Sequence, residues 1–281
     1  MKLRSMLFVP GDRPDRMAKA LASGADALIL DLEDSVTPAN KGAARQAVAK
    51  FLAETHGEVS LWVRVNPLDS GMTHDDLGAA HGADGIVLPK AETGADVASL
   101  DAMLGGIAAR ILPIATETPA AVFGLGSYAG CSPRLAGITW GAEDLPAAIG
   151  AVSSREQDGS YTPPYEMVRA LALFGAHAAG VRAIETVYPD FRNLDGLKSY
   201  CARAMRDGFT GMMAIHPAQI EIINAAFTPS EEAVAHAQRV VAAFAASPEA
   251  GALQLDGKMI DAPHLKQAEA TTFRRGARTS T

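Results

Sequence analysis

Short apolar runs alternate with longer amphipathic stretches along most of this chain. The apolar runs lie at residues 4–9, 27–31, 61–67, 85–90, 110–116, 135–140, 182–186 and 211–215. Short apolar runs bounded by turn residues predict buried strands, whereas apolar spacings of three and four residues predict helices. The helical spacing occupies residues 13–23, 40–55, 73–80, 95–104, 165–180, 194–207 and 218–226, and Thr118 with Pro119 begins a further helix. Eight strands alternating with helices predict an α/β fold of the (β/α)8 TIM barrel type.

Two parts of the chain depart from that alternation. After Leu145 the pattern lapses into a polar segment that extends to Ser160, and we expect a loop there on the active-site face. Beyond the eighth strand, residues 229–247 predict an additional helix, and residues 253–263 predict an extended arm with a turn. A polar tail follows from about Thr271. A barrel does not need this C-terminal arm, which therefore indicates a functional or intersubunit role.

Length and composition fit one large domain with an appendage. The chain has 281 residues, of which 48% are hydrophobic, enough to bury a large core. We expect the barrel to be a catalytic domain over residues 1–228, followed by a C-terminal helix and arm over residues 229–281.

Charge and cysteine content exclude several classes of protein. A net charge of −7 and a pI near 5.5 argue against a nucleic-acid partner. The two cysteines have neither disulfide-scaffold nor zinc-site spacing. The N-terminal apolar run is too short for a signal peptide, and no run approaches the roughly 18 residues needed to cross a bilayer. We therefore expect a cytoplasmic protein without a membrane partner.

Two carboxylates end adjacent predicted strands, where barrel enzymes place their chemistry. Glu117 follows the strand at 110–116, and Asp144 follows the strand at 135–140. Taken singly, each carboxylate serves equally well beside the N-terminus of a helix, where backbone N–H groups stabilise a negative charge. As a pair without nearby His or Cys, they favour a hard cation, and Mg²⁺ suits two carboxylates that leave positions for water and substrate.

Other charged residues at the same predicted rim have structural alternatives. Glu33 and Asp34 could accept hydrogen bonds from metal-bound water, or form a solvated acidic turn. Arg64 lies in an apolar run and needs an anion, either a buried structural carboxylate or a substrate carboxylate; beside a metal site we favour the substrate. Lys90 has the same two alternatives. His216 fits a structural hydrogen-bonding residue better than a base.

Three basic residues follow the first predicted strand. Arg13, Arg16 and Lys19 lie on the first predicted turn and helix and could hold the phosphates of a substrate. Each of them taken alone fits a solvated helix face at least as well.

Several short motifs occur along the chain in an order that resembles one known family. They lie at residues 7–14, 30–36, 63–66, 88–90, 117–118, 141–145 and 214–217. Together they closely resemble the citrate lyase β-subunit-like proteins of the HpcH/HpaI aldolase superfamily. The correspondence covers nearly the whole chain, so it is far more specific than any single motif.

That resemblance implies a Mg²⁺-dependent TIM barrel enzyme that cleaves a β-hydroxyacyl-CoA into an acyl-CoA and a keto acid, or condenses the two. The expected CoA thioester is of the malyl-, citramalyl- or citryl-CoA type, and the expected keto acid is glyoxylate, pyruvate or oxaloacetate. Carried over by position, Glu117 and Asp144 are the metal ligands. Arg64 is catalytic and holds the keto acid, and the substrate-binding residues are Arg64, Glu117, Arg13 and Lys19.

The C-terminal arm also resembles a segment of this family. CoA lyases place the stretch matched by residues 257–263 over the active site of a neighbouring subunit. By that match Asp261 protonates the acyl-CoA enolate, or removes the α-proton in the condensing direction. Asp256 is a nearby alternative, and an ordinary turn carboxylate is the structural one. A homotrimer or homohexamer with shared sites is thus implied.

Three other functions remain open at this point. The same metal site could support a malyl-CoA thioesterase. A class II aldolase acting on free hydroxy-keto acids would use an early histidine and would lack the arm, whereas this chain has no histidine before His56. The third alternative is a subunit that works only within a citrate lyase complex.

Overall fold

A computed structural model describes residues 2–276 of the chain. Residue 1 of the predicted barrel domain and residues 277–281 of the predicted C-terminal tail lie outside the described residues. The chain divides into one compact unit over Leu3–Asn224 and a second unit that contains the chain from Ala225 onward.

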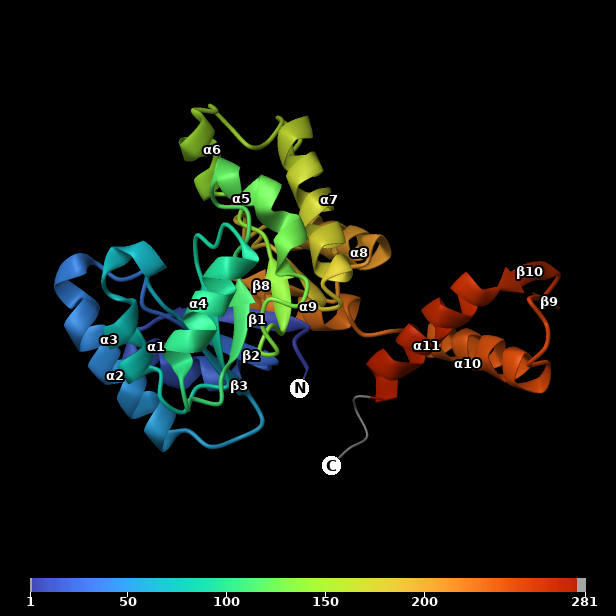
Figure 1. Ribbon diagram of the computed structural model, residues 1–281, viewed down its shortest axis with the longest axis horizontal. Coiled ribbons are helices and arrows are strands. Elements are labelled where there is room, and N and C mark those ends of the chain that lie inside the picture. Colours follow the sequence, from blue (N-terminus) through green and yellow to red (C-terminus); the bar gives the residue numbers. More distant parts are fainter. Residues whose placement is uncertain (1, 277–281) are drawn as a thin grey trace. The chain divides into compact units, whose positions relative to one another are not determined.

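The first unit is built around eight parallel strands (Figure 1). They are β1 (Ser5–Pro10), β2 (Ala27–Asp31), β3 (Ser60–Arg64), β4 (Gly85–Leu88), β5 (Arg110–Pro113), β6 (Gly137–Thr139), β7 (Arg182–Glu185) and β8 (Gly211–Ala214). Their order is β5-β4-β3-β2-β1-β8-β7-β6, and parallel bridges between Ile111 and Leu135 and between Ile114 and Thr139 link the two ends. The strands therefore form a nearly closed barrel, and the predicted (β/α)8 fold is confirmed.

Helices surround these strands (Figure 1). The α-helices are α1 (Pro14–Ala20), α2 (Lys41–Glu54), α3 (Thr73–Ala79), α4 (Gly94–Leu104), α5 (Pro119–Gly124), α6 (Asp144–Ile149), α7 (Pro163–Ala178), α8 (Leu194–Asp207) and α9 (Ile220–Ala226). Shorter 3-10 turns are η1 (Leu21–Ser23), η2 (Pro38–Asn40), η3 (Leu68–Ser70), η4 (Leu125–Tyr128) and η5 (Pro217–Gln219).

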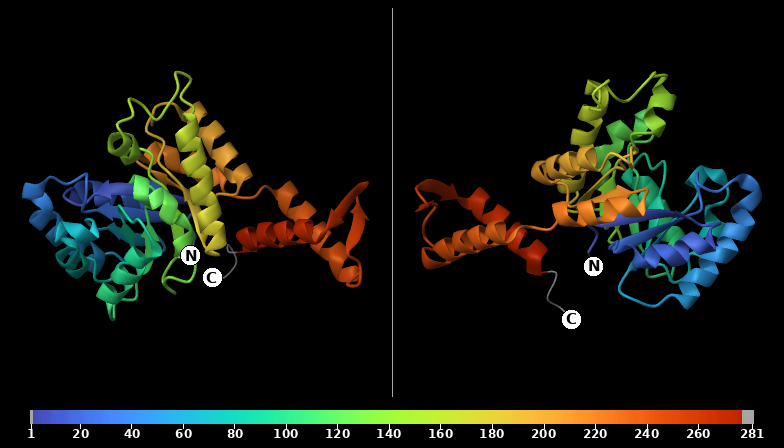
Figure 2. Two further views of the ribbon diagram at one scale, coloured as in Figure 1. Left: turned by 45° about the horizontal axis from the view of Figure 1, so that its top comes forward. Right: turned by 180° about the vertical axis from the view of Figure 1, so that it is seen from behind.

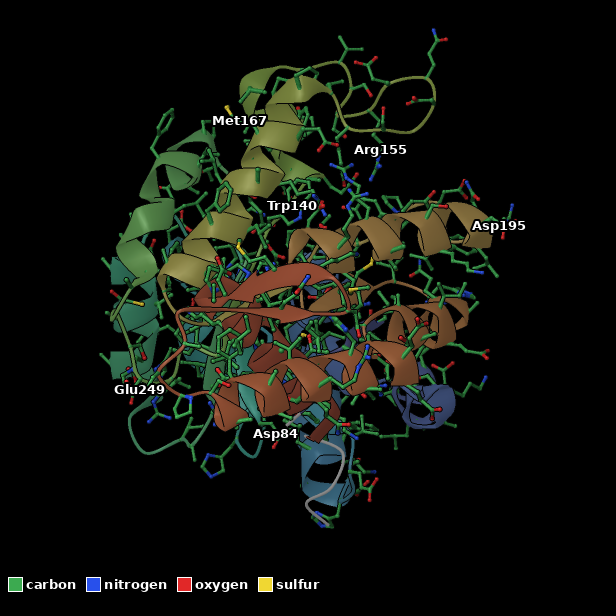
Figure 3. The ribbon with its side chains drawn as sticks, turned by 90° about the vertical axis from the view of Figure 1, so that its right-hand side faces the viewer. Asp84, Trp140, Arg155, Met167, Asp195 and Glu249 are labelled. Carbon is green, nitrogen blue, oxygen red and sulfur yellow. The ribbon has the colours of Figure 1, made fainter. Side chains whose placement is uncertain are left out.

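The local signals at two helices differ in how well they predict structure. Thr118 caps α5 as expected, since its hydroxyl accepts a hydrogen bond from the backbone N–H of Ala121. The expectation of a loop beginning at Leu145 was wrong in its first turn, because α6 runs from Asp144 to Ile149 before the polar segment begins. That helix is too short to show a helical repeat in sequence. In α7, Met167 lies on the exposed outer face (Figure 3).

The barrel interior is filled by one face of each strand. These inward side chains include Met6, Ile29, Trp62, Val87, Leu112, Ile184 and Met213. Trp62 is fully buried and lies opposite Gly85 in the β3–β4 register. A Cβ atom at Gly85 would lie only 2.3 Å from the indole ring, so the tryptophan requires a glycine there.

The second unit pairs two helices with a β-hairpin (Figure 2). Its elements are α10 (Glu231–Ala246), β9 (Ala252–Leu255), β10 (Lys258–Asp261) and α11 (Ala262–Gly276). Asp256 and Gly257 both have positive φ and form the hairpin turn, as Asp-Gly sequences favour. The predicted extended arm is thus an antiparallel hairpin, and the predicted polar tail from Thr271 is helical through Gly276. No helix in residues 2–276 has the length and apolar character needed to cross a membrane.

Substituting Gly85 tests the packing of the barrel core. We expect Gly85→Ala to lower the free energy of unfolding by about 1–3 kcal/mol, because the new methyl group collides with Trp62 and overpacks the core. Gly42→Ala is the matched control: Gly42 lies in α2 with open space around it, and alanine there should raise stability by up to about 1 kcal/mol. Urea unfolding measures the free energy of unfolding of both variants, and an equal change in the two would contradict the packing argument.

Candidate active site

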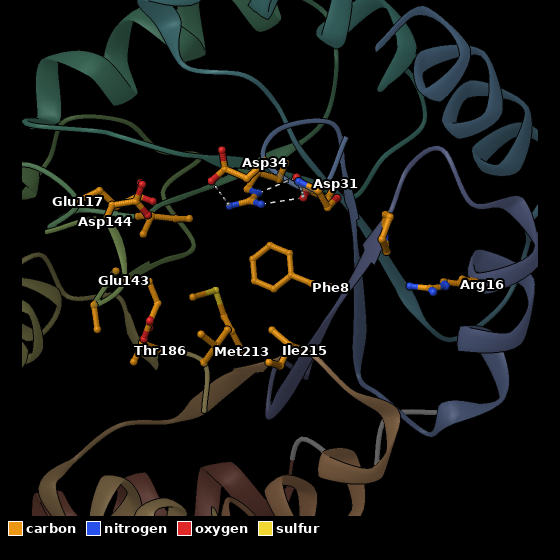
Figure 4. Close-up of a pocket in the computed structure, with 17 residues that line it drawn as sticks. Phe8, Arg16, Asp31, Asp34, Glu117, Glu143, Asp144, Thr186, Met213 and Ile215 are labelled. Carbon is orange, nitrogen blue, oxygen red and sulfur yellow. Dashed lines mark hydrogen bonds and ion pairs between the residues drawn. The ribbon is translucent and has the colours of Figure 1, made fainter. Parts of the chain in front are cut away.

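A cavity of about 480 Å³ opens where the barrel strands end (Figure 4). It is lined by Phe8, Pro10, Arg16, Asp31, Asp34, Ser35, Arg64, Ile114, Glu117, Gly141, Ala142, Glu143, Asp144, Thr186, Val187, Met213 and Ile215. Most of these residues lie near the C-terminal end of a strand or within five residues after it. The cavity therefore lies at the C-terminal face of the barrel, where enzymes of this architecture carry out their chemistry.

The structure brings the two predicted metal ligands to this cavity. Glu117 follows β5 and is 4% exposed, and Asp144 begins α6 after β6. Gly141 allows Glu117 to pack closely, since a Cβ atom there would lie 2.6 Å from the Cγ of Glu117. Burial raises the pKa of Glu117 to about 8, although Lys90 opposes the shift through a backbone hydrogen bond and its charge.

Arg64 is held by carboxylates of the protein itself. Its Nε and Nη2 each lie 2.7 Å from an oxygen of Asp31, and its Nη1 lies 2.8 Å from Oε2 of Glu33. The structural alternative therefore supplies an anion to the buried guanidinium, and the expected contact with a substrate carboxylate stays a prediction. Two of its five guanidinium N–H bonds donate to Asp31, Glu33 lies within ion-pair distance, and the side chain still lines the cavity.

Asp31 was missed as a site residue in the sequence. Its side chain is 2% exposed, and in the β2–β3 register it lies opposite Arg64. Burial by itself raises the pKa of Asp31, but the hydrogen bonds and charge of Arg64 outweigh it and hold that pKa below the ordinary value. The available signal in the sequence was that Asp31 and Arg64, of opposite charge, each end an apolar strand. Only the pairing of β2 with β3 shows that the two residues are neighbours.

Lys90 contacts three acids of the site, although in the sequence it carried only a weak signal. Its Nζ lies 3.2 Å from Oε1 of Glu33 and 3.2 Å from Oδ1 of Asp144. Its backbone N–H donates to Oε2 of Glu117 at 2.5 Å. Burial of Glu33 raises the pKa of its carboxyl despite the nearby Arg64 and Lys90.

The basic residues after β1 separate into two groups. Arg16 lines the cavity, and Figure 4 shows it on the opposite side of the Phe8 ring from Glu117 and Asp144. Arg13 is 45% exposed and pairs with neighbouring Asp15, and neither Arg13 nor Lys19 lines the cavity.

Of the two acids predicted to accept hydrogen bonds from metal-bound water, Asp34 is more exposed than Glu33. Asp34 lines the cavity with 61% of its side chain exposed, and its Oδ2 lies 4.0 Å from Arg64. His216 serves as a structural residue, since its Nδ1 accepts a hydrogen bond from the backbone N–H of Ala218 and its ring stacks on Phe191.

The predicted proton donor belongs to the second unit. Asp261 ends β10, is 36% exposed, and its Oδ1 lies 2.5 Å from Nδ1 of His264. Asp256, the alternative acid, is tied instead to Arg239 at 2.8 Å. The role of Asp261 stays a prediction.

The donor set of the cavity fits a divalent cation of the Mg²⁺ type. Carboxylates outnumber cations here: the acids are Asp31, Glu33, Glu117 and Asp144, with Asp34 at 4.0 Å from Arg64, and the cations in contact with them are Arg64 and Lys90. Within residues 2–276, no three side chains of the His, Cys, Asp or Glu type gather as a metal site. Glu117 and Asp144 would therefore supply the protein ligands, and water or substrate the rest, as Mg²⁺ tolerates.

Comparisons with known proteins identify the family of this chain. Residues 4–217 match the HpcH/HpaI aldolase/citrate lyase family. The citrate lyase subunit beta-like protein of Mycobacterium tuberculosis H37Rv is 38% identical over 276 residues, covering 98% of this chain and 96% of the relative. The L-malyl-CoA/beta-methylmalyl-CoA lyase of Cereibacter sphaeroides is 31% identical over 293 residues, covering 95% and 92%.

A solved structure extends the likeness to the fold. CitE from M. tuberculosis, in complex with magnesium, acetoacetate and coenzyme A, superimposes with a TM-score of 0.80 at 37% identity and covers 97% of both chains. The names of these relatives support a lyase, and the resemblance drawn from the motifs is confirmed. On fold, sequence and site together, this chain belongs to the HpcH/HpaI aldolase/citrate lyase family.

Proposed function

We propose that this protein is a Mg²⁺-dependent carbon–carbon lyase that cleaves, or in reverse forms, a β-hydroxyacyl-CoA of the malyl-, citramalyl- or citryl-CoA type. One observation carries the proposal: Glu117 and Asp144 reach one cavity from neighbouring strands, and the acids of this cavity outnumber its cations. The magnesium, acetoacetate and coenzyme A bound by the M. tuberculosis relative support it.

The residues of the cavity divide the work of this reaction. Glu117 and Asp144 hold the cation, which when bound would polarise the oxygen at the bond that breaks. Arg64 uses its remaining N–H bonds to hold the carboxylate of the keto acid, while Asp31 keeps the guanidinium in place. Glu33 and Asp34 orient water at the site.

The CoA portion extends past the basic residues after β1. Arg16 lies on the far side of Phe8 from the acids, which suits a path for the thioester toward the rim (Figure 4). We propose that Arg13, just before α1, and Lys19, in the last turn of α1, bind CoA phosphates. Both side chains are accessible to a ligand, because Arg13 is 45% exposed and Lys19 is also exposed.

The second unit supplies the proton in this proposal. Asp261 would protonate the acyl-CoA enolate after cleavage, or take the α-proton during condensation. A homotrimer or homohexamer would place the arm of one subunit over the cavity of its neighbour. The carboxylate at the end of β10 supports this role, because it is partly exposed and pairs with the imidazole of His264.

A condensation assay tests the reaction. With Mg²⁺ and acetyl-CoA, and with glyoxylate, pyruvate and oxaloacetate in turn, we expect one keto acid to give a new CoA ester by mass spectrometry. Loss of either ligand, in Glu117→Gln or Asp144→Asn, should abolish Mg²⁺ binding in calorimetry and lower kcat at least about 100-fold, since the cation stabilises developing charge. Glu54→Gln, at an exposed site on α2, is the control that should change neither.

Two results would overturn this proposal. Turnover of free hydroxy-keto acids without action on any CoA ester would place the enzyme with the free-acid aldolases. Hydrolysis of the thioester without carbon–carbon cleavage would make it a thioesterase.

Mixing inactive variants tests whether subunits share a site. Glu117→Ala and Asp261→Ala should each be inactive alone, and a mixture should recover part of the activity once subunits exchange, because some sites then combine an intact cavity with an intact arm. Asp256→Asn distinguishes the two acids of the hairpin and should retain activity, since Asp256 is paired with Arg239. If native mass spectrometry shows that the subunits have exchanged and the mixture still recovers no activity, the arm does not serve a neighbouring site.

A further inference from the structure

Lys90 connects acids that come from three other strands of the barrel. Glu33 follows β2, Glu117 follows β5, and Asp144 follows β6, whereas Lys90 itself comes just after β4. Its ammonium lies 3.2 Å from oxygens of both Glu33 and Asp144. The backbone N–H of the same residue donates to Glu117 at 2.5 Å. A single residue therefore ties together three carboxylates that would otherwise repel one another.

The backbone of Lys90 adopts an uncommon conformation that makes these contacts possible. Its φ is +52°, and within residues 2–276 only Asp256 is another non-glycine residue with positive φ. Such a conformation is unfavourable for a residue with a Cβ atom and persists where surrounding contacts hold it. Here it directs the N–H at Glu117 while the side chain reaches the other two acids.

The ammonium of Lys90 contacts a carboxylate, that of Asp144, which is also proposed to bind Mg²⁺. Asp144 is the more exposed of the two proposed metal ligands, with 38% of its side chain accessible, and Lys90 contacts the Oδ1 of that carboxylate. An ammonium and a divalent cation cannot share one carboxylate oxygen without mutual repulsion. The ammonium of Lys90 therefore lies where it would repel a metal ion bound to Asp144.

We propose that Lys90 is the resident counter-ion of the carboxylate cluster, a positioning residue that holds Glu33 and Asp144 before Mg²⁺ binds and competes with Mg²⁺ for Asp144. The proposal rests on the proposed function, because it requires Mg²⁺ at Glu117 and Asp144. It adds a residue that weakens metal binding while improving the geometry of the site.

Removing the ammonium has a consequence that distinguishes this role from a purely structural one. Without Lys90 the cluster loses one positive charge, so Mg²⁺ should bind more tightly. Glu33 and Asp144 would at the same time lose a common anchor, so turnover should fall. A residue that only stabilised the fold would weaken metal binding and turnover together when substituted.

Calorimetric titration with Mg²⁺ tests the proposal on the full-length protein. Lys90→Met keeps a side chain of similar length and retains the backbone N–H to Glu117. We expect this variant to bind Mg²⁺ about tenfold more tightly than the wild type, since one unit of positive charge near the cation is lost. The rise in Tm on adding Mg²⁺ should also be larger. Lys50→Met, at a position 74% exposed on α2, should bind Mg²⁺ like the wild type.

Two additional measurements keep the test decisive. The kcat of Lys90→Met should fall about tenfold with the keto acid that the wild type condenses, while Lys90→Arg should return the Mg²⁺ affinity toward the wild-type value. If Lys90→Met does not fold, Lys90→Gln removes the charge and retains hydrogen bonding, and its Mg²⁺ affinity should rise in the same way.

The outcomes separate this inference from the proposed function. Weaker or unchanged Mg²⁺ binding in the folded neutral variants would overturn the role of Lys90 while leaving the metal site intact. Failure of the wild type to bind Mg²⁺ would overturn the metal site itself, and the role of Lys90 with it.

Discussion

The rim of this barrel depends on a buried ion pair between Arg64 and Asp31. The parallel register of β2 and β3 places the two residues opposite each other, and their side chains are 12% and 2% exposed. Removing one partner of such a pair leaves a buried charge uncompensated, at a cost of about 3–5 kcal/mol. Because Glu33 also contacts Arg64, the pair holds the loop after β2 against the cavity.

That loop is supported from behind as well. The ammonium of Lys41 donates to the carbonyl oxygens of Leu32 and Glu33 at 2.6 and 2.8 Å, and to Asn66 at 2.8 Å. Asn66 in turn donates to the fully buried Asp76. These contacts fix the backbone of the loop, so that the side chain of Glu33 can face Arg64 and the cavity in a defined position.

The electrostatics of the rim follow from this framework. Carboxylates gathered from separate strands would repel one another, and the two cations offset only part of that charge. The excess makes the cavity suited to a divalent cation rather than to a carboxylate substrate alone. In the proposed reaction the framework supplies a preorganised acidic site, and the basic residues beyond Phe8 supply the part that faces the thioester.

The sequence alone determined the alternation of strands and helices, and hence the barrel, because periodicity is local. It also predicted that Glu117 and Asp144 lie at one face of the barrel, since the ends of adjacent parallel strands share one face. It did not identify Asp31 or the contacts of Lys90. Their partners depend on strand register and on one positive φ angle, and both are properties of the assembled backbone. For the same reason the sequence could not show that Asp31 on the neighbouring strand supplies an anion to Arg64. A charge within an apolar run indicates that a partner is needed, but only the tertiary structure determines which residue is that partner.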